Sequence, residues 1–154
     1  MFTAKQLLTN TDYEALPERL EAEPERLRAE FLAIAADPNE HYLFRTRSLR
    51  ILDFHANELG VFSSSDVADG LLAAFPRHFS PEKLNELANA LRIGHRPWDS
   101  WLAYVFCVTL ARVAPDRAQG AIDSVRQIFK GTARGSSLDS HLALLKRLRE
   151  KRGP

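Results

Sequence analysis

Apolar residues recur at three- and four-residue intervals along most of this chain, which is the spacing of helices with one buried face. No window shows the alternating apolar and polar residues of a half-buried strand. The pattern therefore predicts an all-α fold of about seven to eight helices. The expected helices cover approximately residues 12–20, 24–37, 38–59, 63–76, 81–93, 98–112, 115–130 and 137–151.

Three glycines punctuate this pattern. Gly60, Gly94 and Gly131 each follow a helical stretch, at intervals of 34 and 37 residues. Glycine is favoured after a helix end because it lacks a Cβ and adopts the left-handed conformation without strain. We expect a single domain over residues 1–154, in which antiparallel helix pairs end near residues 60, 94 and 131 and a last helix follows over about 137–151.

Other residues mark where individual helices start and stop. Ser80 and Pro81 are an N-cap and a first helical residue. Pro76 is expected to end the helix that precedes them, because proline has no N–H to donate. Residues 134–137 are expected to form a loop, after which Ser136 and Asp139 have the spacing of a capping box.

The helix pairs resemble HEAT-like repeats. The resemblance rests on the segments from Pro81 to Gly94 and from Pro115 to Gly131, with their apolar stripes, and it covers about residues 24–131. It implies a short α-solenoid, in which each helix pair packs on its neighbours. A compact irregular bundle is the alternative architecture.

The stretch from Trp98 to Arg112 is apolar on nearly every side, so we expect the central helix there. Its longest uncharged run has twelve residues, against the ~20 that a membrane-spanning helix needs. Cys107, the only cysteine, lies in this run, where burial would make its thiol unreactive. The first residues lack the basic and apolar segments of a signal peptide, which favours a cytoplasmic location.

Sequence motifs of catalysis and metal binding are absent: the chain has no His-x-x-x-His, Cys-x-x-Cys, Gly-x-Ser-x-Gly or phosphate-binding glycine loop. We therefore expect no cofactor, no metal and no enzymatic activity. Asp53 and His55 lie about 200° apart around one helix and do not converge, which favours a core role for His55. The alternative is an enzyme whose site joins distant residues, such as His55 with His95 or Glu86.

Charge is distributed unevenly, although the net charge is only +1. Residues 1–40 carry nine acidic and four basic side chains, and the remainder of the chain has an excess of basic ones. Glutamates recur at four-, three- and four-residue spacing at positions Glu14, Glu18, Glu21 and Glu25. A solvated helix face explains this pattern, but so does an acidic face that binds a basic partner protein.

Aromatic residues at Trp98, Trp101 and Tyr104 follow helical spacing at the start of the central helix. Core packing explains most of this stripe. Trp98 is nearest to the turn at Arg96 and Pro97, and we expect it to be the most exposed of the three. An exposed tryptophan is a candidate contact residue in a protein interface.

Basic residues suggest a different partner, nucleic acid. The long helix carries Arg45, Arg47 and Arg50, which its geometry scatters over most of the circumference. The last helix has a denser basic set, namely Lys146, Arg147, Arg149, Lys151 and Arg152. The helix dipole also favours cations at a C-terminus, and a net charge of +1 argues against strong phosphate binding.

The hypothesis that these observations favour is a protein-binding module that engages a basic partner through its acidic N-terminal helices. Small, motif-free, all-helical proteins of this kind resemble bacterial immunity proteins, which inhibit a toxin by covering its active site or substrate groove. The resemblance implies a basic toxin or nuclease as the partner, and Glu14, Glu18, Glu21, Glu25 and Trp98 as contact residues. Nucleic-acid binding through the last helix and a motif-free enzyme remain the alternatives, and the oligomeric state is open.

Overall fold

The computed structural model describes residues 2–9 and 15–152, and within them the chain forms nine helices and no strand. These are α1 (Ala4–Thr9), α2 (Leu16–Ala22), α3 (Pro24–Ala36), α4 (Tyr42–Asn57), α5 (Ser64–His78), α6 (Pro81–Arg92), α7 (Trp98–Val113), α8 (Gln119–Phe129) and α9 (Ala133–Arg152). The prediction of an all-α fold is confirmed.

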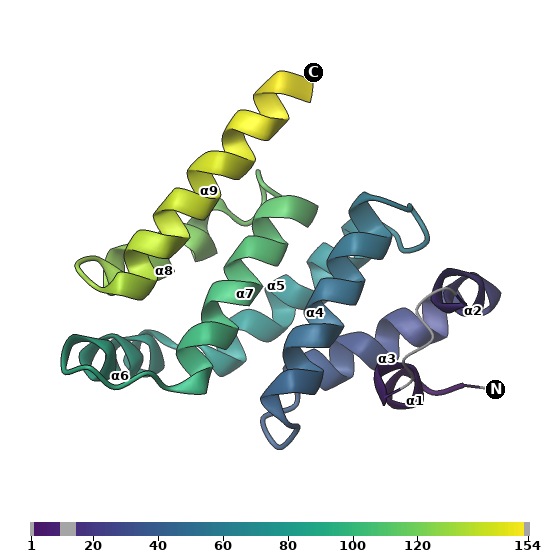
Figure 1. The fold of residues 1–154 in the computed structure, drawn as a ribbon, viewed down its shortest axis with the longest axis horizontal. Helices are drawn as coiled ribbons and strands as arrows, with labels where there is room; N and C mark the ends of the chain where they lie inside the picture. The colour runs from purple at the N-terminus through teal and green to yellow at the C-terminus, as the bar shows by residue number, and fades with distance from the viewer. Residues whose placement is uncertain (1, 10–14, 153–154) are drawn as a thin grey trace.

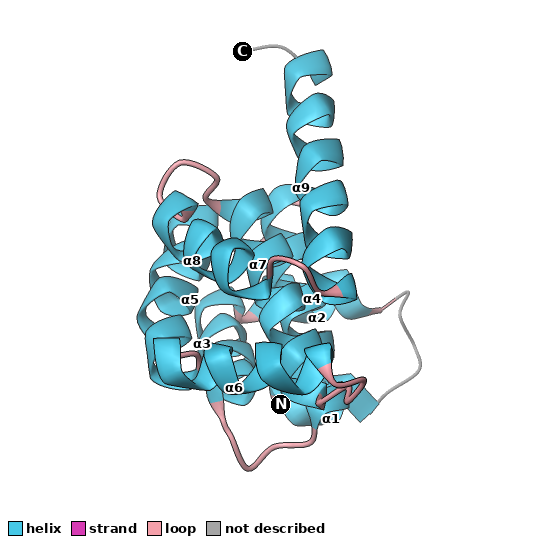
Figure 2. Ribbon diagram, turned by 90° about the vertical axis from the view of Figure 1, so that its left-hand side faces the viewer, coloured by secondary structure: helices cyan, strands magenta, loops and turns pink. Residues whose placement is uncertain are grey.

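Helix α7 is the central element, as its apolar sequence predicts. It contacts α4, α5, α6, α8 and α9, while α3 packs against α4 and α5. Figure 1 shows α7 between α4 and α9, with α1, α2 and α3 on the far side of α4. The C-terminal half of α9 extends beyond the other helices (Figure 2). The two ends of the described chain therefore lie on different parts of the molecule.

The three glycine stops are confirmed. Gly60, Gly94 and Gly131 have φ angles of 65°, 88° and 85°, in the left-handed region that favours glycine. Ser80 caps α6 as predicted, because its Oγ accepts a hydrogen bond from the Lys83 N–H at 3.2 Å. Local sequence signals thus fix these helix ends.

Helices near the N-terminus differ from the expected ranges. The sequence pattern does not predict α1, and α2 begins at Leu16, while the start expected near residue 12 lies outside the described residues. Helix α4 begins at Tyr42 rather than residue 38. Its cap is His41, whose Nδ1 accepts a hydrogen bond from the Leu43 N–H at 3.1 Å. A histidine cap carries a weaker sequence signal than serine or aspartate.

The stop predicted at Pro76 is wrong, since α5 continues to His78. Proline in the last turn removes only its own N–H bond from the helix. The next turn still closes, because the Phe79 N–H donates to the Phe75 carbonyl at 2.9 Å. The loop predicted at residues 134–137 is also wrong.

Helix α9 begins before that expected loop, at Ala133. The cap is Thr132, whose Oγ1 accepts a hydrogen bond from the Gly135 N–H at 3.0 Å. Gly135 is packed so closely on the Phe129 carbonyl that a Cβ would clash with it. The glycine therefore serves helix packing here rather than a loop, and the predicted capping box of Ser136 and Asp139 does not start the helix.

Buried apolar side chains form one continuous core, with Phe31, Phe106 and Phe129 fully enclosed. Cys107 is buried as predicted, and burial raises the pKa of its thiol to about 12. Two leucines are exposed, Leu59 just after the end of α4, at 47%, and Leu148 in α9, at 42%.

Candidate functional site

The acidic N-terminal surface consists of Glu18 and Glu21 on α2 and Glu25 in the first turn of α3. All three side chains are exposed. Glu18 and Glu25 lie in first turns, where the positive end of the helix dipole stabilises carboxylates. Glu14, the fourth glutamate of the predicted series, lies outside the described residues.

Two neighbouring carboxylates share one cation as an ion-pair partner, whereas these three carboxylates have none in the described chain. Arg26 forms ion pairs with Glu23, at 2.7 Å, and with Glu30. The hydrogen bond from Arg26 is the main reason why the pKa of Glu23 lies below its usual value. Within the described residues, no ion pair is formed by Glu18, Glu21 or Glu25. Their charges are therefore available to a partner.

Trp98 begins α7 and is 60% exposed, as predicted. Its indole stacks on the Tyr42 ring of α4, with centroids 4.0 Å apart and planes inclined by 9°. The His41 ring also stacks on Tyr42, at 4.6 Å. The sequence pattern predicts the exposure of Trp98 but not its contacts with Tyr42 and His41, which are more than 50 residues away in the chain.

The aromatic stack and the acidic surface belong to different parts of the molecule. Trp98 contacts the start of α4, and α2 packs on α3. In Figure 1, α4 lies between α7 and α2. The structure thus places the predicted contact residues in two separate groups.

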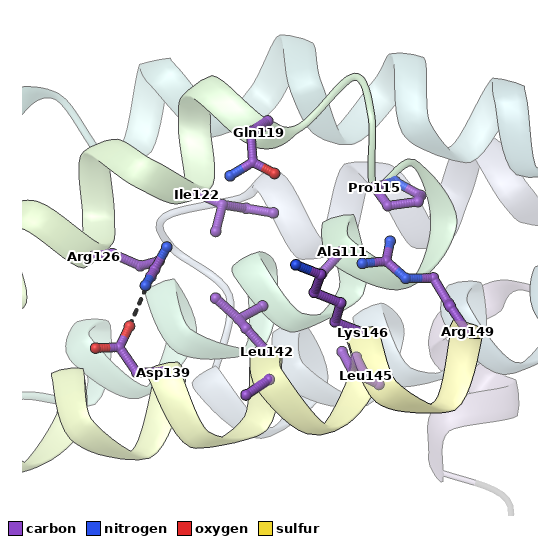
Figure 3. A pocket seen from close by; sticks show the side chains of 11 residues that line it. Ala111, Pro115, Gln119, Ile122, Arg126, Asp139, Leu142, Leu145, Lys146 and Arg149 are labelled. Atoms are coloured by element: carbon purple, nitrogen blue, oxygen red, sulfur yellow. Dashed lines mark hydrogen bonds and ion pairs between the residues drawn. The ribbon is translucent and has the colours of Figure 1, made fainter. Parts of the chain in front are cut away.

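A third surface surrounds the C-terminal half of α9. A hollow of about 380 Å³ lies between α7, α8 and α9, with an apolar floor that includes Ala111, Ile122 and Leu142 (Figure 3). Charged side chains form its rim. Arg126 is paired there with Asp139 at 2.7 Å. The rim therefore contains both a neutralised cation and cations without a local partner.

Lys146 and Arg149 line this hollow, and Arg149 and Arg152 line a second one of about 210 Å³ beside it. No ion pair joins these three cations to any residue in the described part of the chain. Leu144 and Leu148 are exposed nearby, at 46% and 42%. The end of α9 is accordingly basic and partly apolar.

The residues of the alternative enzyme site differ in burial. His55 is buried near the Phe54 and Phe62 rings, and burial lowers its pKa. The core role predicted for His55 is confirmed, whereas His95 and Glu86 are exposed. Asp53 turns to Arg112, with Oδ1 and Nε 3.0 Å apart.

The described residues contain neither a candidate metal centre nor a candidate membrane-spanning helix. No group of three or more histidine, cysteine, aspartate or glutamate side chains in residues 2–9 and 15–152 is placed to hold a metal ion. Among the described helices, none combines the length and apolar character needed to span a bilayer. Comparison with protein-family models, curated proteins and solved structures finds no match to this chain.

Proposed function

We propose that this chain is a protein-binding module that engages a basic partner through Glu18, Glu21 and Glu25. The observation that carries the proposal is the contrast in charge pairing: these three carboxylates are exposed and unpaired within the described chain, while the adjacent Glu23 and Glu30 both form ion pairs with Arg26. Unpaired surface charge of one sign favours a partner surface of the other sign, mainly by speeding and orienting encounter.

The specific form of the proposal is an immunity-type inhibitor. Carboxylates from two consecutive helices would occupy the basic groove in which a toxin or nuclease binds its own anionic substrate. Inhibition then follows from occlusion, without chemistry by the inhibitor. Trp98, stacked on Tyr42, is proposed as a separate contact, because exposed tryptophan and tyrosine often dominate the binding energy of an interface.

The test is an affinity capture from the native host with the tagged chain, at moderate salt. We expect wild type to retain one stoichiometric basic protein, and Glu18→Lys/Glu21→Lys to lose it. The matched control is Glu86→Lys/Glu150→Lys, which makes the same charge change at two exposed glutamates elsewhere. Equal recovery by all three baits, or recovery of nucleic acid alone, would show that the acidic surface is not the binding surface.

A second candidate function, nucleic-acid binding, is favoured by the unpaired cations of α9. Lys146, Arg149 and Arg152 lie on a helix end that extends from the body (Figure 2). Affinity for a mixed-sequence DNA duplex should then fall steeply with salt. Replacing Lys146 and Arg149 by glutamine should reduce the log–log salt slope by about 1.8, or about 0.9 for each lost phosphate contact. An unchanged slope would count against this candidate.

A further inference from the structure

A cavity of about 420 Å³ lies away from the acidic surface, where α5 ends and where α4, α6 and α7 begin. Its polar lining consists mostly of cationic or ionisable side chains: Arg45, Arg77, His78, Ser80, Lys83 and Asp99. Arg45, Lys83 and Asp99 come from the first turns of three different helices. The positive ends of three helix dipoles, those of α4, α6 and α7, and the negative end of the α5 dipole therefore meet around one space.

Arg45 is the unusual residue of this cavity, because it is a cation that is only 6% exposed. The Nε–H donates to the Ala35 carbonyl at 3.1 Å, but Nη2 has no hydrogen-bond partner among the described residues. A buried guanidinium nitrogen without an acceptor costs free energy, which an acceptor bound at this residue would offset.

The carboxylate that lines the cavity does not fill this role. Asp99 forms an ion pair with Lys83 at 3.0 Å, and no ion pair to Arg45 exists within the described chain. Burial lowers the pKa of Arg45, although Asp99 and Asp37 are near enough to favour its charged form. One lining acid thus faces three lining cations, Arg45, Arg77 and Lys83, which leaves an excess of positive charge.

We propose that this cavity binds the oxyanion group, phosphate or carboxylate, of a small molecule, with Arg45 as the buried donor. A guanidinium offers several N–H donors in a plane and forms strong, charge-assisted hydrogen bonds with such groups. Arg77 adds charge at the exposed side of the cavity, and Ser80 adds a hydroxyl. The volume is within the range of small-molecule sites. This site is independent of the proposed protein-binding function.

The test measures thermal unfolding and calorimetric binding of the full chain with sodium phosphate and with sodium acetate, against sodium chloride at the same ionic strength. We expect one of the two oxyanions to stabilise wild type beyond chloride, which also identifies the preferred group. Arg45→Lys keeps a cation but removes the guanidinium, and it should weaken binding at least about tenfold. Arg77→Gln, at an exposed position, should weaken it severalfold.

The matched control is Arg50→Gln, which removes an exposed arginine from α4 outside the cavity lining. It should bind the oxyanion as wild type does. No stabilisation of wild type beyond chloride would overturn the proposal, and so would equal weakening in Arg77→Gln and Arg50→Gln. Arg77→Gln keeps the test decisive if Arg45→Lys fails to fold. Because no variant touches Glu18 or Glu21, the result is separate from that of the capture experiment.

Discussion

The Trp98 indole lies parallel to the Tyr42 ring, 4.0 Å between centroids, and so joins the first residues of α7 and α4 across the surface. We predict that Trp98→Ala lowers the free energy of unfolding by only about 1 kcal/mol. The loss is small because the side chain is 60% exposed and stacking adds about 0.5–1.5 kcal/mol. Urea unfolding followed by circular dichroism gives the value.

The comparison for this prediction is Phe106→Ala, which removes a fully buried ring from α7. A loss of about 3–5 kcal/mol is expected there. If the two variants lose equal stability, Trp98 is a structural residue. If Trp98→Ala keeps its stability but loses the captured partner, the exposed indole contributes to binding.

The buried His55 should make stability depend on pH. Burial lowers its folded-state pKa, so below about pH 6.5 the unfolded chain binds a proton that the folded chain does not. Stability should therefore fall as pH decreases below about 6.5. In His55→Leu the fall should be smaller, as measured by urea unfolding at each pH.

The control variant for this prediction is His95→Gln, which removes an exposed histidine outside the core. His78 also has a lowered pKa, through burial and the nearby Arg45, so part of the slope should persist in His55→Leu. A profile unaltered by His55→Leu would show that His55 does not carry the effect.

Two helical glycines should respond in opposite ways to alanine. Gly135→Ala places a Cβ against the Phe129 carbonyl and should destabilise the fold by about 1–3 kcal/mol. A Cβ on Gly120 would have no atom within 4 Å, so Gly120→Ala should stabilise α8 by about 0.5 kcal/mol. Chemical denaturation of both variants tests the pair, and a neutral Gly135→Ala would contradict the close packing.

Two leucines of α9, Leu138 and Leu148, should differ in how much stability the protein loses when each is replaced by alanine. Leu138 is fully buried, and Leu138→Ala should cost about 2–5 kcal/mol of stability. Leu148 is 42% exposed, and Leu148→Ala should cost under about 1 kcal/mol. Equal losses in denaturation curves would mean that the end of α9 packs on the body in solution.

Which segments are helical, and where most of the helices end, could be predicted from the sequence because the causes are local. Ser80 accepts a hydrogen bond only three residues away, and Gly94 needs only its own backbone freedom. The stop predicted at Pro76 is wrong because a proline near the end of a helix does not necessarily end it. Its position within the helix decides whether the helix continues. The need for glycine at position 135 comes from the nearby Phe129 carbonyl, and this contact depends on how the helices pack.

The candidate sites show the same division. Exposure of Trp98 follows from its position beside a turn, whereas its stack on Tyr42 requires the fold. Arg45 has a signal that periodicity could detect: Leu49 and Leu52 follow it at four and seven residues, on the buried face of α4. The cavity that it lines joins residues from four helices, and no local pattern reveals that.

The separation of charge between the two ends of the chain has a kinetic consequence. Unpaired glutamates lie on α2 and α3, while unpaired cations lie at the far end of α9 (Figure 1). Such a molecule has an electric dipole and turns in the field of a charged partner before contact. If the chain binds the basic partner proposed above, the association rate constant should therefore decrease as salt shortens the Debye length, while the dissociation rate constant stays nearly constant.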